Sequence, residues 1–110
     1  MQGVERATET LAVIVPAYNE SERIEEALSQ VLRYLDEAGL EGQVIVVDDG
    51  SADETRALAQ QVATGDARVR VVGYNTNYGK GYAVRQGVAA ADADVIVFLD
   101  ADLSTPCLTA

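Results

Sequence analysis

Four short apolar runs, rich in valine and isoleucine and interrupted only by Arg70, recur along this chain of 110 residues. Apolar residues that follow one another without alternating with polar ones are typical of strands buried on both faces of a sheet. The pattern therefore predicts four buried strands, at residues 11–15, 44–47, 69–72 and 95–99.

The first gap between the runs has helical periodicity. Apolar side chains recur every three or four positions along residues 21–35, which predicts an amphipathic helix. Asn19 or Ser21 is expected to cap its first turn and Gly39 to end it.

The second and third gaps also predict helices. Ser51 and Glu54 have the spacing of a capping box, so we expect a helix that begins there and ends near Gly65. A third helix is expected after Gly79, and its sheet-facing residues would be Ala83, Val84, Val88 and Ala91. Because parallel strands joined by helices make right-handed crossovers, the alternation predicts an α/β fold: a three-layer parallel sheet with helices on both sides.

Composition excludes several classes of function. Eight basic and eighteen acidic residues give a net charge of −10, which would repel a nucleic-acid backbone, so no nucleic-acid partner is expected. With Cys107 as the single cysteine and no histidine, the chain cannot build an internal disulfide, a multi-cysteine zinc site or a Ser-His-Asp triad. Residues 1–6 lack the apolar centre of a secretory signal, so we expect a cytoplasmic location.

Two carboxylates follow the last apolar run. Asp100 and Asp102 are spaced i and i+2, so on extended chain they point to the same side. Mg²⁺ prefers oxygen ligands and is often held by one or two carboxylates together with phosphate oxygens of a substrate. The pair predicts a divalent-metal site that handles phosphate, the alternative being an acidic turn after a buried strand. In an open α/β sheet, ligands bind beyond the carboxyl ends of the strands, where this pair lies.

The segments that follow the four runs resemble the family 2 glycosyltransferases of the GT-A fold. They are Val-Ile-Val-Pro-Ala-Tyr-Asn-Glu at 13–20, Val-Val-Asp-Asp-Gly-Ser at 46–51, Asn-Tyr-Gly-Lys-Gly at 77–81 and Asp-Ala-Asp at 100–102. Residues 100–106 are similar to the polyprenyl-phosphate (dolichyl-phosphate) glucosyltransferase and mannosyltransferase branch. The resemblance implies an N-terminal extension at 1–10 and, at 11–110, the Rossmann-like, nucleotide-sugar-binding half of a GT-A domain, truncated after Asp-Ala-Asp.

The resemblance also implies site residues. One carboxylate of the pair Asp48 and Asp49 would accept a hydrogen bond from the base, although acidic residues are also favourable at a helix start. Lys80 would meet the diphosphate, the alternative being a solvated loop lysine. A Mg²⁺ or Mn²⁺ cofactor would be held by Asp100 and Asp102. The full set expected to contact the nucleotide sugar is Pro16, Ala17, Tyr18, Glu20, Val47, Asp48, Asp49, Lys80, Asp100 and Ala101.

The activity that the resemblance implies is inverting, metal-dependent transfer of a hexose from UDP-glucose or GDP-mannose to an acceptor. A polyprenyl phosphate is the expected acceptor, which would place the protein at the inner face of a membrane. The general base would lie in the missing half, and the exposed last strand predicts a homodimer. The alternatives are a nucleotide-sugar-binding or regulatory domain without transferase activity, an Asp-x-Asp phosphotransferase and a receiver-like signalling module.

Overall fold

The computed structural model describes residues 10–100 and confirms the predicted alternation of strands and helices. The strands are β1 (Leu11–Ala17), β2 (Gly42–Asp49), β3 (Val69–Tyr74) and β4 (Val95–Phe98). The helices are α1 (Ile24–Ala38), α2 (Thr55–Gly65) and α3 (Lys80–Ala90). Three residues named above, Ala101, Asp102 and Cys107, lie outside the described residues.

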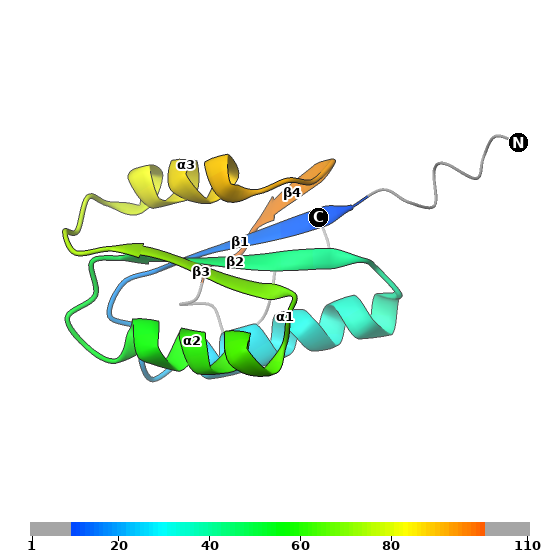
Figure 1. Ribbon diagram of the computed structural model, residues 1–110, viewed down its shortest axis with the longest axis horizontal. Coiled ribbons are helices and arrows are strands. Elements are labelled where there is room, and N and C mark those ends of the chain that lie inside the picture. The colour runs from blue at the N-terminus through cyan, green and yellow to red at the C-terminus, as the bar shows by residue number, and fades with distance from the viewer. Residues whose placement is uncertain (1–9, 101–110) are drawn as a thin grey trace, which may run out of the picture.

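The four strands form one parallel sheet in the order β3-β2-β1-β4. Leu11 pairs with Gly42 on one side and with Val95 on the other. Helices α1 and α2 cover one face of the sheet and α3 covers the opposite face (Figure 1). The fold is therefore the predicted three-layer α/β arrangement, and the carboxyl ends of all four strands meet at one edge.

The strands at the centre of the sheet are more deeply buried than those at its sides. The inner strands β1 and β2 are almost wholly buried, with Val13 packed toward α1 and Ile14 toward α3. The outer strands β3 and β4 are only partly covered, and Phe98 is 52% exposed. The expectation of burial on both faces is wrong for these two, because α3 packs mainly on β1 and β2 and α2 mainly on β3, so within the described residues neither outer strand is fully covered by helices on both faces.

Helix α3 lies unusually close to the sheet. Ala83 and Gly87 are its buried residues, whereas Val88, expected to face the sheet, is 39% exposed. A Cβ atom added at Gly87 would stand 2.4 Å from Ile14 Cγ2 and 3.1 Å from Val47 Cγ2. Because Gly87 has no side chain, α3 can pack this close to the sheet. The face of α3 that contacts the sheet is centred on Ala83 and Gly87 and turned away from Val88.

The N-terminal ends of α1 and α2 differ from expectation, whereas their C-terminal ends do not. Helix α1 begins at Ile24 and α2 at Thr55, and neither N-cap position makes a side-chain capping bond. The capping-box prediction for Ser51 and Glu54 is thus wrong, and so is the capping of α1 by Asn19 or Ser21. The ends are as predicted: Gly39 adopts the left-handed conformation with φ of 67° after α1, and Gly65 is the last residue of α2.

Candidate active site at the carboxyl edge of the sheet

A pocket of about 230 Å³ lies at the carboxyl edge of the sheet. The carboxyl ends of β1 and β2 and the loops after β1, β3 and β4 line it, so residues far apart in the sequence meet there as the motifs predict. Its lining consists of Pro16, Ala17, Tyr18, Glu20, Asp49, Asn77, Gly79, Lys80, Ala83 and Asp100. Val47 and Asp48 do not line it, and the lining adds Asn77, Gly79 and Ala83 to the residues expected to bind. A signal for these three existed, because the Asn-Tyr-Gly-Lys-Gly segment and the helix after it carry them.

Asp49 fixes one wall of this pocket. Its buried carboxylate accepts hydrogen bonds from Asn77 Nδ2 at 2.8 Å and from the backbone N–H groups of Tyr78 at 3.0 Å and Gly79 at 2.9 Å. A carboxylate has about four acceptor sites. Asp49 therefore holds the β3–α3 loop in place at the pocket.

Asp48 points to the opposite face of the sheet, as alternation along a strand requires. Its Oδ2 accepts a hydrogen bond from Arg56 Nε at 2.9 Å, and Arg56 Nη2 donates to the Tyr74 carbonyl at 2.6 Å. The arginine crosses Gly73, where an added Cβ would stand only 2.7 Å from Arg56 Nε. Asp48, 1% exposed, is thus engaged in joining α2 to β2 and β3. No sequence pattern marked Arg56 for this position.

The β1–α1 loop is held by the loop before α2. Three consecutive backbone N–H groups donate to three side chains: Asn19 to Ser51 Oγ at 2.8 Å, Glu20 to Thr55 Oγ1 at 2.8 Å, and Ser21 to Asp53 Oδ2 at 3.2 Å. In return, the Ala52 N–H donates to Asn19 Oδ1 at 2.8 Å. These contacts occupy the side chains of Asn19 and Ser51, two of the residues that were expected to cap helices.

Asp53 carries a charge suited to this role. Partial burial raises the pKa of Asp53, but hydrogen bonds from Thr55 and Ser21 outweigh that effect and hold the pKa below its usual value of 3.8. The carboxylate is therefore ionised at neutral pH and is a strong acceptor for the loop amides.

Lys80 and Asp100 form an ion pair at the pocket. Lys80 is the first residue of α3 and Asp100 follows β4, so the pair joins the third and fourth loops. Asp100 brings one of the two expected metal-binding carboxylates to the pocket, and its hard oxygen atoms suit Mg²⁺ or Mn²⁺. Between residues 10 and 100 there is no group of three acidic, cysteine or histidine side chains that could hold a metal ion.

Comparison with known proteins shows which family this chain belongs to. The model for "Glycosyl transferase family 2" matches residues 12–106. The chain belongs to glycosyl transferase family 2. All four motif segments of this family 2 chain lie within the matched segment.

Among relatives of this family 2 chain, the dolichyl-phosphate beta-glucosyltransferase of Mus musculus is 39% identical over 105 residues, which cover 89% of this chain and 32% of that protein. The undecaprenyl-phosphate 4-deoxy-4-formamido-L-arabinose transferase of Proteus mirabilis is 34% identical over 97 residues, covering 87% and 30%. The chain therefore spans about a third of the length of the curated relatives it matches.

A solved structure shares the fold of this family 2 chain. The mannosyltransferase PcManGT from Pyrobaculum calidifontis, in complex with GDP-Man and Mn²⁺, superposes with a TM-score of 0.74 at 29% identity. The match covers 87% of this chain and 29% of that one. The Rossmann-like half of a GT-A fold is thus the correct description of the described residues.

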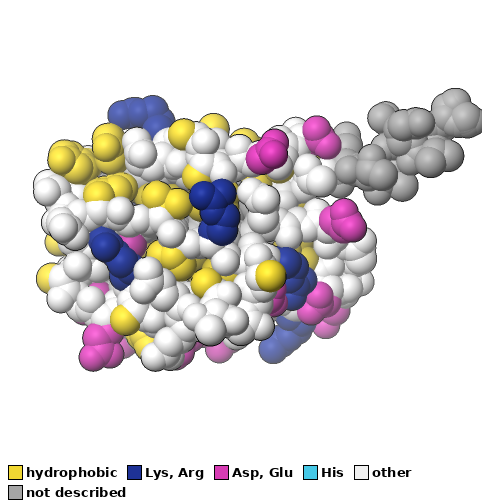
Figure 2. Space-filling model, in the orientation of Figure 1, with side chains coloured by type: hydrophobic (Ala, Val, Ile, Leu, Met, Phe, Trp, Pro, Cys, Tyr) yellow, Lys and Arg dark blue, Asp and Glu magenta, His cyan; other side chains and the backbone are white. Residues whose placement is uncertain are grey.

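Three tyrosines extend the site beyond the pocket. The rings of Tyr78 and Tyr82 lie 4.5 Å apart, and Tyr74 meets Tyr82 edge to face at 5.2 Å. Burial, followed by the effect of the nearby Asp49 carboxylate, raises the pKa of Tyr74 above its usual value. Figure 2 shows hydrophobic side chains gathered over the β3–α3 loop and the start of α3, at the left of the view. The rings brace this loop from outside the pocket.

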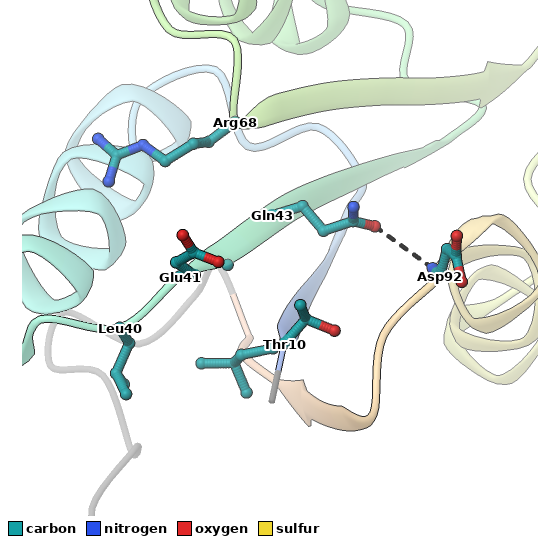
Figure 3. Close-up of a pocket in the computed structure, with 8 residues that line it drawn as sticks. Thr10, Leu40, Glu41, Gln43, Arg68 and Asp92 are labelled. Carbon is teal, nitrogen blue, oxygen red and sulfur yellow. Dashed lines mark hydrogen bonds between the residues drawn. The ribbon is translucent and has the colours of Figure 1, made fainter. Parts of the chain in front are cut away.

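A larger cavity of about 430 Å³ lies at the opposite, amino edge of the sheet (Figure 3). Thr10, Leu40, Glu41, Gln43, Arg68 and Asp92 are among its lining residues. The guanidinium of Arg68 is already bound by Asp36 at 2.9 Å and Asp66 at 2.7 Å. None of the residues expected from the motifs lines this cavity, so its size does not make it the site of the chemistry.

Proposed function

We propose that this chain contributes the nucleotide-sugar-binding site of an inverting glycosyltransferase, formed by residues 11–110. The observation that carries the proposal is the convergence of residues from all four motif segments on one pocket at the carboxyl edge. The donor would be UDP-glucose or GDP-mannose. A polyprenyl phosphate is the proposed acceptor, because the relatives from Mus musculus and Proteus mirabilis are named as dolichyl-phosphate and undecaprenyl-phosphate transferases.

The nucleoside would be held by the first and second loops. Pro16, Ala17 and Glu20 line the pocket, and the half-exposed ring of Tyr18 offers an aromatic face to the base or ribose. Of the two adjacent carboxylates, only Asp49 lines the pocket, so we assign the base or ribose contact to Asp49. Asp48 and Val47 would act indirectly, by supporting β2.

The diphosphate would lie near Lys80 and the start of α3. The ammonium of Lys80 and the positive end of the helix favour negative charge there. Asp100 and Asp102 would hold Mg²⁺ or Mn²⁺, and Ala101, which lies between them in the sequence, would contact the donor. The bound cation would neutralise charge on the departing nucleoside diphosphate. The Mn²⁺ in the PcManGT complex supports this choice of cation.

The transfer itself places few demands on this half of the site. An oxygen of the acceptor forms a bond to the anomeric carbon while the bond from that carbon to the diphosphate oxygen breaks. A phosphomonoester with a second pKa of about 6 is already largely ionised at neutral pH, so it needs no strong base. Alignment of the donor and neutralisation of its charge would supply most of the rate enhancement.

Such an acceptor would keep the protein at a membrane surface, and we propose peripheral association with the inner face of that membrane. No helix within residues 10–100 is long and apolar enough to cross a bilayer. Flotation of the protein with vesicles that contain a polyprenyl phosphate, compared with vesicles that lack it, tests this association.

Titration calorimetry with UDP and GDP, each with and without Mn²⁺, tests the donor site. We expect one of the nucleotides to bind and Mn²⁺ to strengthen its binding. A protein that binds neither nucleotide under any of these conditions would refute the proposal. Transfer of labelled sugar to a polyprenyl phosphate then distinguishes an enzyme from a domain that only binds nucleotide sugars.

A further inference from the structure

Ser51, which does not cap a helix, and its neighbours Asp53 and Thr55 accept hydrogen bonds from another loop. We infer that Ser51, Asp53 and Thr55 are positioning residues for donor recognition, which hold the β1–α1 loop in its binding conformation. The inference rests on the proposed function, because it concerns the loop that presents Tyr18 and Glu20 to the pocket. These three residues are called the loop clamp below.

The loop clamp acts on three successive backbone amides. The N–H groups of residues 19, 20 and 21 each donate to a different clamp side chain. A run of consecutive amides is a common anion-binding device when it is open to a ligand. Here the clamp uses these donors, so the loop contributes to the pocket through its side chains, and the diphosphate is left to Lys80 and α3.

Thr55 is the centre of the clamp. It is completely buried, its hydroxyl donates to Asp53 Oδ1, and Thr55 Oγ1 in turn accepts the hydrogen bond from the Glu20 N–H. The Thr55 backbone N–H also donates to Asp53 Oδ1, at 3.0 Å. Loss of the hydroxyl would leave the Glu20 N–H without its acceptor and loosen Asp53 at the same time.

Asn19 shows that the loop needs holding. Its φ of 53° is in the left-handed region, and it is the one non-glycine residue with positive φ within the described part of the chain. Side-chain and backbone bonds on both sides, to Ser51 and Ala52, stabilise this conformation. Since Asn19 lies between Tyr18 and Glu20, its backbone angles set the direction of both pocket side chains.

Ordering a loop before binding strengthens binding, because the entropy cost is met during folding. We therefore expect Thr55→Val, which keeps the shape of the side chain, to weaken Mn²⁺-dependent nucleotide binding about tenfold. Thr55→Ser restores the hydroxyl and should bind within about twofold of the wild type. Thr64→Val is the matched control, because Thr64 lies on the same helix and donates only to the Gln60 carbonyl at the surface.

Two readouts separate positioning from simple loss of structure. Titration calorimetry with UDP and GDP plus Mn²⁺ gives the affinity, and hydrogen exchange of the amides at 19–21 gives the order of the loop in the unliganded protein. We expect Thr55→Val to speed exchange at these amides while the sheet amides stay protected. If Thr55→Val does not fold, Ser51→Ala carries the same test, because Ser51 is only partly buried.

Each outcome has a definite meaning. Wild-type affinity in a folded Thr55→Val or Ser51→Ala variant overturns the inference and leaves the proposed function intact. The inference also fails if exchange at 19–21 is unchanged, or if Thr55→Ser binds as weakly as Thr55→Val. A wild-type protein that binds neither nucleotide overturns the proposed function itself, and this inference with it.

Discussion

Gly87 gives a direct test of how α3 is docked on the sheet. The position lies inside the helix, where alanine is favoured over glycine by about 0.8–1.0 kcal/mol. Helix propensity alone therefore predicts that Gly87→Ala stabilises the protein. The structure predicts the opposite, because the new Cβ would stand 2.4 Å from Ile14 Cγ2.

The size of the effect follows from what surrounds the new methyl group. Ile14 and Val47 are both fully buried on the two central strands, so neither side chain has room to move away. Overpacking of this kind costs about 1–3 kcal/mol. A contact of 2.4 Å belongs in the upper part of that range, about 2–3 kcal/mol. After the gain of about 1 kcal/mol in helix propensity, we expect a net loss of about 1–2 kcal/mol, which lowers the melting temperature of a domain of this size by about 4–8 °C per kcal/mol.

Urea and thermal unfolding measure this loss. Gly65→Ala is the control, because Gly65 is also helical and an added Cβ there meets nothing within 4 Å, so it should be neutral or stabilising. In an Ile14→Ala background, Gly87→Ala should become much less costly, since the clashing methyl is gone. Gly87→Ala that is as stable as the wild type would refute this account of how α3 approaches the sheet.

Three further predictions concern charge and edges. Asp49→Asn should lower the free energy of unfolding in urea by about 2–3 kcal/mol, because an amide cannot accept all three loop hydrogen bonds. The Arg68 side chain holds the pKa of Asp66 below its usual 3.8, so Asp66 stabilises the fold above that pH and ceases to do so as the pH falls through its folded-state pKa. Asp66→Asn should accordingly flatten the acid-side loss of stability in urea titrations. Phe98→Lys on the exposed β4 should weaken self-association in sedimentation experiments, and a wild type that is monomeric at high concentration contradicts the expected homodimer.

The order of strands and helices was predictable because each signal is local. Valine-rich runs and helical spacing are properties of short segments, and the structure confirms them. The caps failed for a related reason. Ser51 has the correct spacing to Glu54 for a capping box, but its hydroxyl accepts a hydrogen bond from the backbone N–H of Asn19, 32 residues earlier in the chain. No local pattern shows that a remote loop will offer a better partner.

Part of the candidate site could likewise be predicted from the sequence and part could not. The rule that ligands bind at the carboxyl ends of parallel strands was enough to predict that the four motif loops meet. Strand alternation requires Asp48 and Asp49 to face opposite sides, but only the observed position of α3 shows that Asp49 has the pocket side. The Arg56 contact with Asp48 depends on α2 lying across Gly73, which sequence spacing does not specify.

The pairing of β1 with β4 has a consequence for how the protein is made. Leu11 pairs with Val95, 84 positions later, and the Lys80–Asp100 contact depends on β4 being in place. Contacts between such distant segments form late in folding because a long loop must close first. While β4 is still inside the ribosome during synthesis, the nascent chain can form the first three walls of the pocket but lacks the wall that follows β4. Nucleotide added to chains stalled at that stage should therefore not be retained.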